Sequence, residues 1–149
     1  MSLDLALTRA SAAQAPEIAR VFRSSRLEAL PYLPILHSPE EDLAYFREAD
    51  FAKDEVWTAS LSGSIIGFIA FSPGWINHLY LLPGMQGKGI GSRLLDLALS
   101  RREALSLWTF QRNSRAIRFY QSKGFIESKR TDGAENEEKT PDVLLHWNP

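Results

Sequence analysis

The sequence predicts a single α/β domain that spans residues 1–149. Short apolar runs typical of strands are interspersed with segments whose apolar residues recur at helical spacing. A length of 149 residues is that of one ordinary domain, and no linker or internal repeat divides the chain. Hydrophobic residues at 44% and charged residues at 23% are ordinary globular values, so the chain can bury a core of its own.

The N-terminal third of the chain predicts one strand and two helices. Alternating leucines over residues 3–7 indicate a short strand. Ser11 is a suitable N-cap for a helix from about Ala12 to Leu30. A serine and a proline just before residue 40 can open a second helix over residues 40–49, whose acidic first turn suits the helix dipole.

The remainder of the chain predicts six further strands and two further helices. The strands are expected at 55–61, 64–72, 75–81, 104–110, 124–128 and 143–147, and the helices at 92–99 and 114–122. Ser62 and Gly63 favour a hairpin between the first two of these strands. Asn113 is a suitable N-cap for the last helix, and Gly124 suits its C-terminal end.

Composition argues against several classes of partner and chemistry. The net charge of -1 does not indicate a nucleic-acid or anionic-membrane binder. The chain has no cysteine and its three histidines lack metal-ligand spacing, so no disulfide, thiolate nucleophile or metal site is expected. No basic and apolar leader opens the sequence, and no apolar run is long enough to span a membrane. A cytoplasmic location is therefore expected.

A glycine-rich segment, Gln86-Gly-Lys-Gly-Ile-Gly91, lies between an expected strand and an expected helix. This order aims unpaired backbone N–H groups and the positive end of a helix at one point, which favours a bound phosphate. A P-loop requires glycines five apart followed by Lys and then Ser or Thr. A dinucleotide fingerprint requires G-x-G-x-x-G and a later acid. The two-residue period of Gly87, Gly89 and Gly91 fits neither pattern, and residues 108–111 contain no acid.

Two motifs carry a resemblance to a known family. Gln86-x-x-Gly89-x-Gly91 resembles the acetyl-CoA signature of the GCN5-related N-acetyltransferase (GNAT) superfamily. Residues 113–125 are similar to the second signature of that family, N-x-x-A-x-x-F-Y-x-x-x-G-F, at every defined position. Two motifs in the right order are more specific than either alone. The resemblance covers about residues 56–147 and implies a mixed central sheet of six or seven strands flanked by about four helices.

The resemblance implies acetyl-CoA as the cosubstrate. In the family, the N–H groups of the glycine-rich turn hold the CoA pyrophosphate, and glycine lets the backbone approach it closely. The backbone of the preceding strand pairs with the pantetheine arm, and Asn113 is expected to hydrogen-bond that arm. The implied cofactor-binding residues are Leu79, Tyr80, Leu81, Gln86, Gly87, Lys88, Gly89, Ile90, Gly91, Ser92, Asn113, Ala116 and Tyr120.

The spacing of the second motif is informative by itself. Asn113, Ala116, Ile117 and Tyr120 share one helix face, and Ala116 leaves room there for another molecule. The resemblance makes Tyr120 the general acid that protonates the leaving thiolate. A phenol with an ordinary pKa near 10 is protonated at neutral pH and can therefore donate. The alternative for Tyr120 is a core aromatic residue whose hydroxyl reaches the surface.

The resemblance implies direct transfer of the acetyl group to an amine within a ternary complex. Backbone N–H groups near Leu79 to Leu81 are expected to stabilise the oxyanion. The general base is open, because neither strand beside the cofactor contains the carboxylate that many relatives carry. His78 titrates in a suitable range, but alternation places it on the opposite face from Asn77 and Leu79. A structural role for His78 and a proton relay through water are the alternatives.

The acceptor is expected to be a small-molecule amine or a peptide amine. The resemblance places its wall in residues 26–37 and 132–142. The first segment offers an apolar and aromatic surface in Tyr32, Leu33 and Leu36. The second carries the acids Glu135, Glu137 and Glu138, which could attract a cationic amine, although a solvated loop is the favoured interpretation.

A second function remains open beside the enzyme. A catalytically inactive CoA-binding sensor or interaction module with the same fold would explain the missing carboxylate base, but it would not explain Tyr120. A homodimer through Trp75, Trp147 and the last strand is a further expectation. The use of another acyl-CoA stays open.

Overall fold

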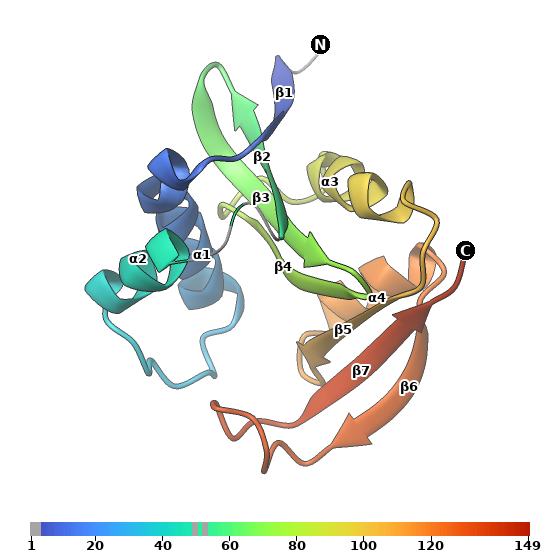
Figure 1. Cartoon of the computed structure of the whole chain (residues 1–149). Coiled ribbons are helices and arrows are strands. Elements are labelled where there is room, and N and C mark those ends of the chain that lie inside the picture. The colour runs from blue at the N-terminus through green and yellow to red at the C-terminus, as the bar shows by residue number, and fades with distance from the viewer. Residues whose placement is uncertain (1–3, 49–50, 52–53) are drawn as a thin grey trace.

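The computed structural model describes residues 4–48, 51 and 54–149 and shows a seven-stranded mixed sheet flanked by helices (Figure 1). The strands are β1 Leu5–Arg9, β2 Glu55–Leu61, β3 Ser64–Ser72, β4 Trp75–Leu81, β5 Leu105–Phe110, β6 Ile126–Thr131 and β7 Asp142–Trp147. The helices are the 3-10 turn η1 Ala12–Gln14 and the α-helices α1 Ala15–Ala29, α2 Pro39–Glu48, α3 Ile90–Leu99 and α4 Ser114–Ser122. The predicted fold class is confirmed.

The helices cover the two faces of the sheet, with α1 and α2 on one side and α3 on the other (Figure 1). Two hydrophobic clusters correspond to these layers, one centred on α1, α2 and β3 and the other on α3, β5 and β7. The central strand β3 is buried on both faces over Ile65–Phe71. A strand covered on both faces needs no polar residues at alternate positions, and this explains why β3 is a continuous apolar run in the sequence.

The first two helices begin close to their expected positions. The segment after Ser11 starts as a 3-10 turn, in which the Ser11 N–H donates to Oε1 of Gln14 at 3.0 Å. The second helix has a reciprocal cap, since the Glu41 N–H donates to Oγ of Ser38 and the Ser38 N–H donates to Oε1 of Glu41. The expected strand start at Leu3 and helix end at Ala49 lie outside the described residues.

Several expected bounds differ from the structure by one to three residues; β1, for example, ends at Arg9 rather than at residue 7. Two of these differences are caused by a glycine with positive φ. Gly89, at φ 79°, is the N-cap of α3, so the helix begins at Ile90 rather than Ser92. Gly124, at φ 99°, ends the turn after α4, and the Phe125 N–H then donates to the Tyr120 carbonyl. The strand expected from Gly124 therefore begins two residues later and continues to Thr131.

The sheet divides between β4 and β5. The strand order is β1-β2-β3-β4-β5-β7-β6, and β4 and β5 are its one parallel pair within the described residues. Their register contains a single residue pair, Trp75 with Ser106, beside a hydrogen bond from the Ser106 N–H to the Gly74 carbonyl at 2.9 Å. The strands therefore separate from their N-terminal ends onward, which leaves the C-terminal half of β4 unpaired on that edge.

No helix within the described residues is long and apolar enough to cross a membrane.

Candidate active site

A cleft of about 90 Å³ lies where β4 and β5 separate. It is lined by Leu30, Ile76, Asn77, His78, Leu79, Tyr80, Leu107, Trp108, Thr109, Phe110, Asn113, Ala116 and Tyr120. Asn113, Ala116 and Tyr120 thus share a face that lines the cleft, as the helical spacing predicted, whereas Ile117, expected on the same face, does not line the cleft and packs against the core. Six of the predicted site residues line this cleft. Three belong to β4 and three to α4 and its N-cap: His78, Leu79, Tyr80, Asn113, Ala116 and Tyr120.

The backbone of β4 offers hydrogen-bonding groups to the cleft. The Leu82 N–H donates to the Ile66 carbonyl at 2.8 Å, and Tyr80 is paired with Phe68 in the same register. Because hydrogen-bonded and non-hydrogen-bonded pairs alternate in an antiparallel ladder, the N–H groups of Leu79 and Leu81 point away from β3. They point toward the edge that β5 leaves open.

The glycine-rich turn follows β4 directly and opens α3. Gly87 and Gly89 have φ values of 77° and 79°, and a β-carbon at either position would meet no atom within 4 Å. Glycine is therefore required there by the backbone conformation and leaves the turn open to a ligand. The first bond of the helix runs from the Arg93 N–H to the Gly89 carbonyl, so the N–H groups of residues 89–92 have no partner within the helix.

The side chains of the glycine-rich turn and of the first helical residues make contacts within the protein itself. Gln86 Oε1 accepts a hydrogen bond from the Gly84 N–H at 3.2 Å and so closes the turn. The side chain of Ile90 is buried in the core, and only its backbone faces the open side. Ser92 Oγ accepts a hydrogen bond from Nζ of Lys123, which brings a positive charge next to the start of α3.

Asn113 and Tyr120 occupy opposite ends of the same helix face. Oδ1 of Asn113 accepts from the Ala116 N–H at 3.3 Å and caps α4, so a hydrogen bond to a ligand would come from Nδ2. Tyr120 is 7% exposed and its ring packs edge-on against Phe119 and Phe125. Burial, with a smaller contribution from Tyr80, raises the pKa of the Tyr120 hydroxyl. The hydroxyl therefore stays protonated at neutral pH and faces the cleft as a donor.

His78 lies on the face of β4 that α1 and α2 cover. Its ring packs edge-on against Phe22, Tyr45 and Phe46, and Nε2 is 3.1 Å from the Tyr45 hydroxyl. Burial, and to a lesser extent the charge of Arg26, lowers the pKa of His78 to about 4. The imidazole is therefore neutral at physiological pH.

A larger cavity of about 620 Å³ lies on the same side of the sheet as His78. It is lined by Phe22, Arg23, Arg26, Leu27, Leu30, Leu33, Pro34, Ile35, Leu36, His37, Glu41, Asp42, Ala44, Tyr45, Glu48, His78, Glu137 and Glu138. His78 and Leu30 line both this cavity and the cleft, so the two meet at His78. Residues from both faces of β4 line the cleft, Asn77 and Leu79 as well as His78, so strand alternation does not keep His78 away from it.

Four of the six side chains expected in the acceptor wall line the larger cavity: Leu33, Leu36, Glu137 and Glu138. Tyr32 and Glu135 do not line it. The guanidinium of Arg112 lies 4.1 Å from the centre of the Tyr32 ring, and the Tyr32 hydroxyl is buried without a partner among the described residues. Tyr32 therefore packs against the segment before α4 instead of facing the cavity.

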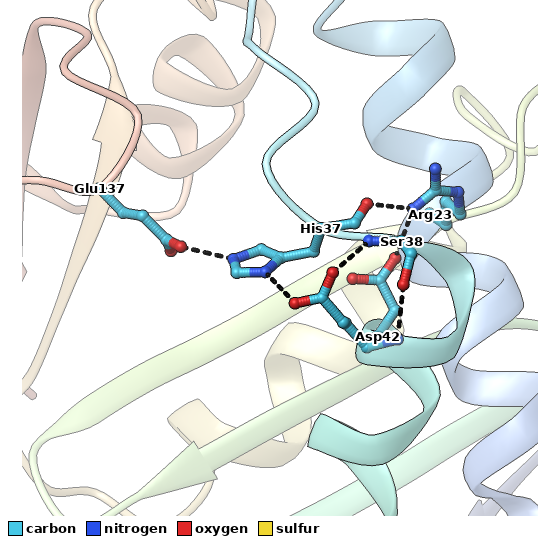
Figure 2. Close-up of polar contacts among 6 residues, drawn as sticks. Arg23, His37, Ser38, Asp42 and Glu137 are labelled. Atoms are coloured by element: carbon cyan, nitrogen blue, oxygen red, sulfur yellow. Dashed lines mark hydrogen bonds and ion pairs between the residues drawn. The ribbon is translucent and has the colours of Figure 1, made fainter.

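Ion pairs surround the larger cavity. Figure 2 shows Arg23 donating to the His37 carbonyl and to Asp42, at 2.9 and 3.1 Å, while the ring of His37 lies between two carboxylates. Its Nε2 is 2.5 Å from Glu137 and its Nδ1 is 3.4 Å from Glu41, and these carboxylates raise the pKa of His37. The acidic segment was expected to be a solvated loop. Glu137 agrees with this, since its side chain is 58% exposed, whereas the side chain of Glu138 is only 16% exposed.

Arg26 and Glu138 form another ion pair, and both residues line the larger cavity. Arg26 Nη2 donates to Glu138 at 2.9 Å, and its guanidinium lies 5.2 Å from the centre of the Phe22 ring. Sequence reasoning included Arg26 only as the first residue of the expected acceptor wall and assigned no role in a site to Tyr45 or Lys123. Their contacts join segments 31 to 112 residues apart along the chain, which no local motif could have indicated.

Metal-ligating side chains do not gather here, since no group of three or more His, Cys, Asp or Glu with metal-binding geometry occurs among residues 4–48, 51 and 54–149.

The divided sheet, the glycine-rich turn and the helix that carries Tyr120 have the arrangement that the resemblance to an acyl-group transferase family implied, and comparisons with known proteins identify the family. Residues 52–127, about half of the chain, match the family described as "Acetyltransferase (GNAT) domain". The chain therefore belongs to the GNAT acetyltransferase family. The predicted family and the predicted class of enzyme are confirmed.

Individual relatives agree with this assignment. An uncharacterized N-acetyltransferase from Archaeoglobus fulgidus is 33% identical over 109 residues, which cover 56% of this chain and 74% of the relative. The peptidyl-lysine N-acetyltransferase YiaC from Escherichia coli is 29% identical over 103 residues, 68% of each chain. The structure of the PaiA N-acetyltransferase from Thermoplasma acidophilum in complex with coenzyme A superposes with a TM-score of 0.74 at 21% identity, over the whole of both chains.

Proposed function

We propose that residues 1–149 form a single N-acetyltransferase domain that moves an acetyl group from acetyl-CoA directly to an amine in a ternary complex. The observation that carries the proposal is that the cleft and the larger cavity meet at His78. Two cosubstrates that approach from opposite sides of β4 would come together at this point. The expected cosubstrate, acetyl-CoA, agrees with membership of an acetyltransferase family and with the coenzyme A held by the T. acidophilum structure.

The cofactor side of the proposed site is built mainly from backbone groups. The N–H groups at the start of α3 would bind the pyrophosphate, with Lys123 as an added cation beside Ser92. The N–H groups of Leu79 and Leu81 would pair with the pantetheine arm and donate to the thioester oxygen as it gains negative charge. Nδ2 of Asn113 would hydrogen-bond the arm.

The proposed proton transfers use one residue on each side of β4. Tyr120, protonated and turned toward the cleft, would give its proton to the departing thiolate as the C–S bond breaks. Neutral His78 would accept the proton that the amine loses as the C–N bond forms, directly or through water. The Tyr45 hydroxyl at 3.1 Å would hold the imidazole in one orientation.

The acceptor is proposed to be an amine that enters the larger cavity. A peptidyl-lysine acetyltransferase among the relatives supports an amine as the receiving group. The inactive CoA-binding module is the less favoured function, because both proposed proton-transfer groups line the cavities where they would act. A cytoplasmic location and a homodimer stay predictions. The last strand does not offer the edge that was expected for a dimer together with Trp75 and Trp147, because β7 is paired on both sides, with β5 and with β6.

The experiment that tests the proposal measures release of free CoA thiol from acetyl-CoA across a panel of amines, with the acetylated product identified by mass spectrometry. An enzyme is expected to release thiol only with an acceptor present and to yield an equal amount of acetylated amine. Binding of CoA in calorimetry without transfer to any amine would show the sensor function instead. Binding of ATP or NAD but not CoA would contradict the cofactor assignment.

A further inference from the structure

The larger cavity has the dimensions of a small-molecule site. Its volume of about 620 Å³ lies within the range of roughly 300 to 1,000 Å³ that is typical of pockets enclosing a whole small ligand. Its wall comes from five parts of the chain: α1, the connection to α2, α2 itself, His78 of β4, and the loop between β6 and β7. A site with walls on this many sides can enclose the body of an acceptor as well as its reacting nitrogen.

Several large apolar side chains in the wall of the larger cavity are exposed to solvent. Leu27, Ile35 and Leu36 are 47%, 69% and 44% exposed, and all three line the same cavity. Single exposed apolar side chains are normal on a protein surface, whereas a group that gathers around one concavity indicates a binding surface. An acceptor with an apolar body would cover them.

The charges of the cavity favour a cation and disfavour an anion. Five carboxylates line it, against two arginines and two histidines, one of which is neutral His78. Both arginines already donate to carboxylates of the same cavity, Arg23 to Asp42 and Arg26 to Glu138. An acceptor carboxylate would therefore find the charge of both arginines already balanced by carboxylates and would meet an excess of negative charge.

The β6–β7 loop is held at the larger cavity by ion pairs with other segments of the chain. Glu138 binds Arg26 of α1, and Glu137 binds His37 of the connection, so two ion pairs hold the loop against the N-terminal half (Figure 2 shows the second). A free small molecule can pass such a loop more easily than a lysine whose own main chain lies on a folded protein.

We infer that the acceptor is a small primary amine on an apolar aliphatic or aromatic body, without a carboxylate, which the larger cavity encloses as a whole. This inference rests on the proposed function and narrows its acceptor. The ammonium group reaches the inner end of the cavity beside His78, and the apolar body lies against Leu27, Ile35 and Leu36. The ammonium first gives up one proton, to His78 directly or through water, because only the neutral amine is a nucleophile. Its nitrogen then bonds to the acetyl carbonyl carbon as the C–S bond breaks, and the second proton lost by the nitrogen is balanced by the proton that the departing sulfur receives, so that CoA thiol is released.

Three acceptors test the inference against the intact enzyme. 2-Phenylethylamine carries the amine and the apolar body, L-phenylalanine adds a carboxylate to them, and a lysine-containing peptide places the amine on a polypeptide. The expected kcat/KM for 2-phenylethylamine is at least about tenfold above that of either other acceptor, since one unfavourable charge or one lost apolar surface is sufficient for such a factor. A higher kcat/KM for the peptide or for L-phenylalanine overturns the inference.

Two matched substitutions locate the effect in the cavity. Ile35→Gln is expected to raise the KM for 2-phenylethylamine about fivefold and to leave the KM for acetyl-CoA unchanged. Ile126→Gln is the control, because Ile126 is 65% exposed on β6 and lines neither cavity, and no change is expected. Equal effects of the two variants would contradict the inference.

Glu138→Gln provides a readout that a merely structural role would not change. It releases Arg26 to bind an anion, so the preference for 2-phenylethylamine over L-phenylalanine should fall about tenfold. An unchanged preference would contradict the charge argument. Transfer to the peptide alone, abolished in Tyr120→Phe, would refute this inference and leave the proposed function intact. Transfer to none of the three amines, together with none across the wider panel, would refute both.

Discussion

The cleft and the larger cavity, on the two sides of β4, are formed by different kinds of chemical group. On the cleft side, the proposed cofactor contacts come from three short segments, residues 79–81, 86–92 and 113–120, and depend largely on backbone N–H groups. On the side of the larger cavity, the wall consists of side chains from α1, the connection, α2 and the β6–β7 loop, joined by ion pairs. The cofactor side can therefore be predicted from a short sequence pattern, since its backbone geometry needs mainly glycines and a helix start, whereas the acceptor side depends on side chains from distant segments.

The largest expected effect is that of Tyr120→Phe, which removes the proposed acid on the cleft side. Turnover is expected to fall about a hundredfold or more, because a positioned proton donor contributes roughly 10²- to 10⁴-fold. The affinity for acetyl-CoA, measured by calorimetry, should remain within about twofold of the wild-type value. Tyr32→Phe is the matched control. The hydroxyl of Tyr32 has no hydrogen-bond partner among the residues that the structure describes, and Tyr32 lines neither cavity. Unchanged turnover in Tyr120→Phe would remove Tyr120 from the mechanism.

The second prediction concerns stability on the other side of β4. The pKa of His78 is about 4 in the folded protein, against an ordinary value near 6.5 in the unfolded chain. The unfolded state therefore binds the proton first as the pH falls, and the folded state loses about 2–3 kcal/mol between pH 6.5 and pH 4. Above pH 6.5 this contribution is constant.

Urea unfolding of the wild type and of His78→Gln at pH 7 and pH 4 measures this loss. The difference between the two proteins cancels the carboxylate titrations they share, and the wild type should lose more stability than the variant. A parallel loss in both proteins would show that His78 titrates normally in the fold.

Gly89→Ala tests whether the cofactor side depends on its backbone. The substitution places a β-carbon at φ 79° in the turn and is expected to raise the KM for acetyl-CoA about tenfold, with the KM for the amine unchanged. Gly63→Ala in the β2–β3 hairpin is the control, because its φ is 84° and its surroundings are equally open. If both variants change only stability, the turn has no specific role in binding.

The smallest expected effect is that of Tyr45→Phe on the side of the larger cavity. Loss of its hydrogen bond to Nε2 of His78 is expected to lower kcat about fivefold, as for one neutral hydrogen bond, without a change in the KM for acetyl-CoA. Rate measurements between pH 5 and pH 9 would show whether the profile shifts as well. A kcat equal to that of the wild type would mean that Tyr45 does not position His78.

Sequence reasoning was most accurate where the signal was local. The bounds of β2, β3, β4 and α4 agree with the expected ranges, because turn residues, caps and apolar runs lie next to the elements that they delimit. The common face of Asn113, Ala116 and Tyr120 followed from helical spacing and was confirmed by the residues that line the cleft. Tyr32 was misplaced because an aromatic residue in an irregular connection gives no period from which its direction could be inferred.

The sequence alone determined the family, the helix that carries Tyr120 and the glycine-rich turn, because each depends on residues close together in the chain. Only the tertiary structure decided that β4 and β5 diverge after one residue pair and that His78 lies where two cavities meet. It also decided that Glu137 and Glu138 bind His37 and Arg26 rather than water alone. These features depend on pairings between distant segments, and such pairings are set by the packing of helices on a sheet rather than by any local pattern.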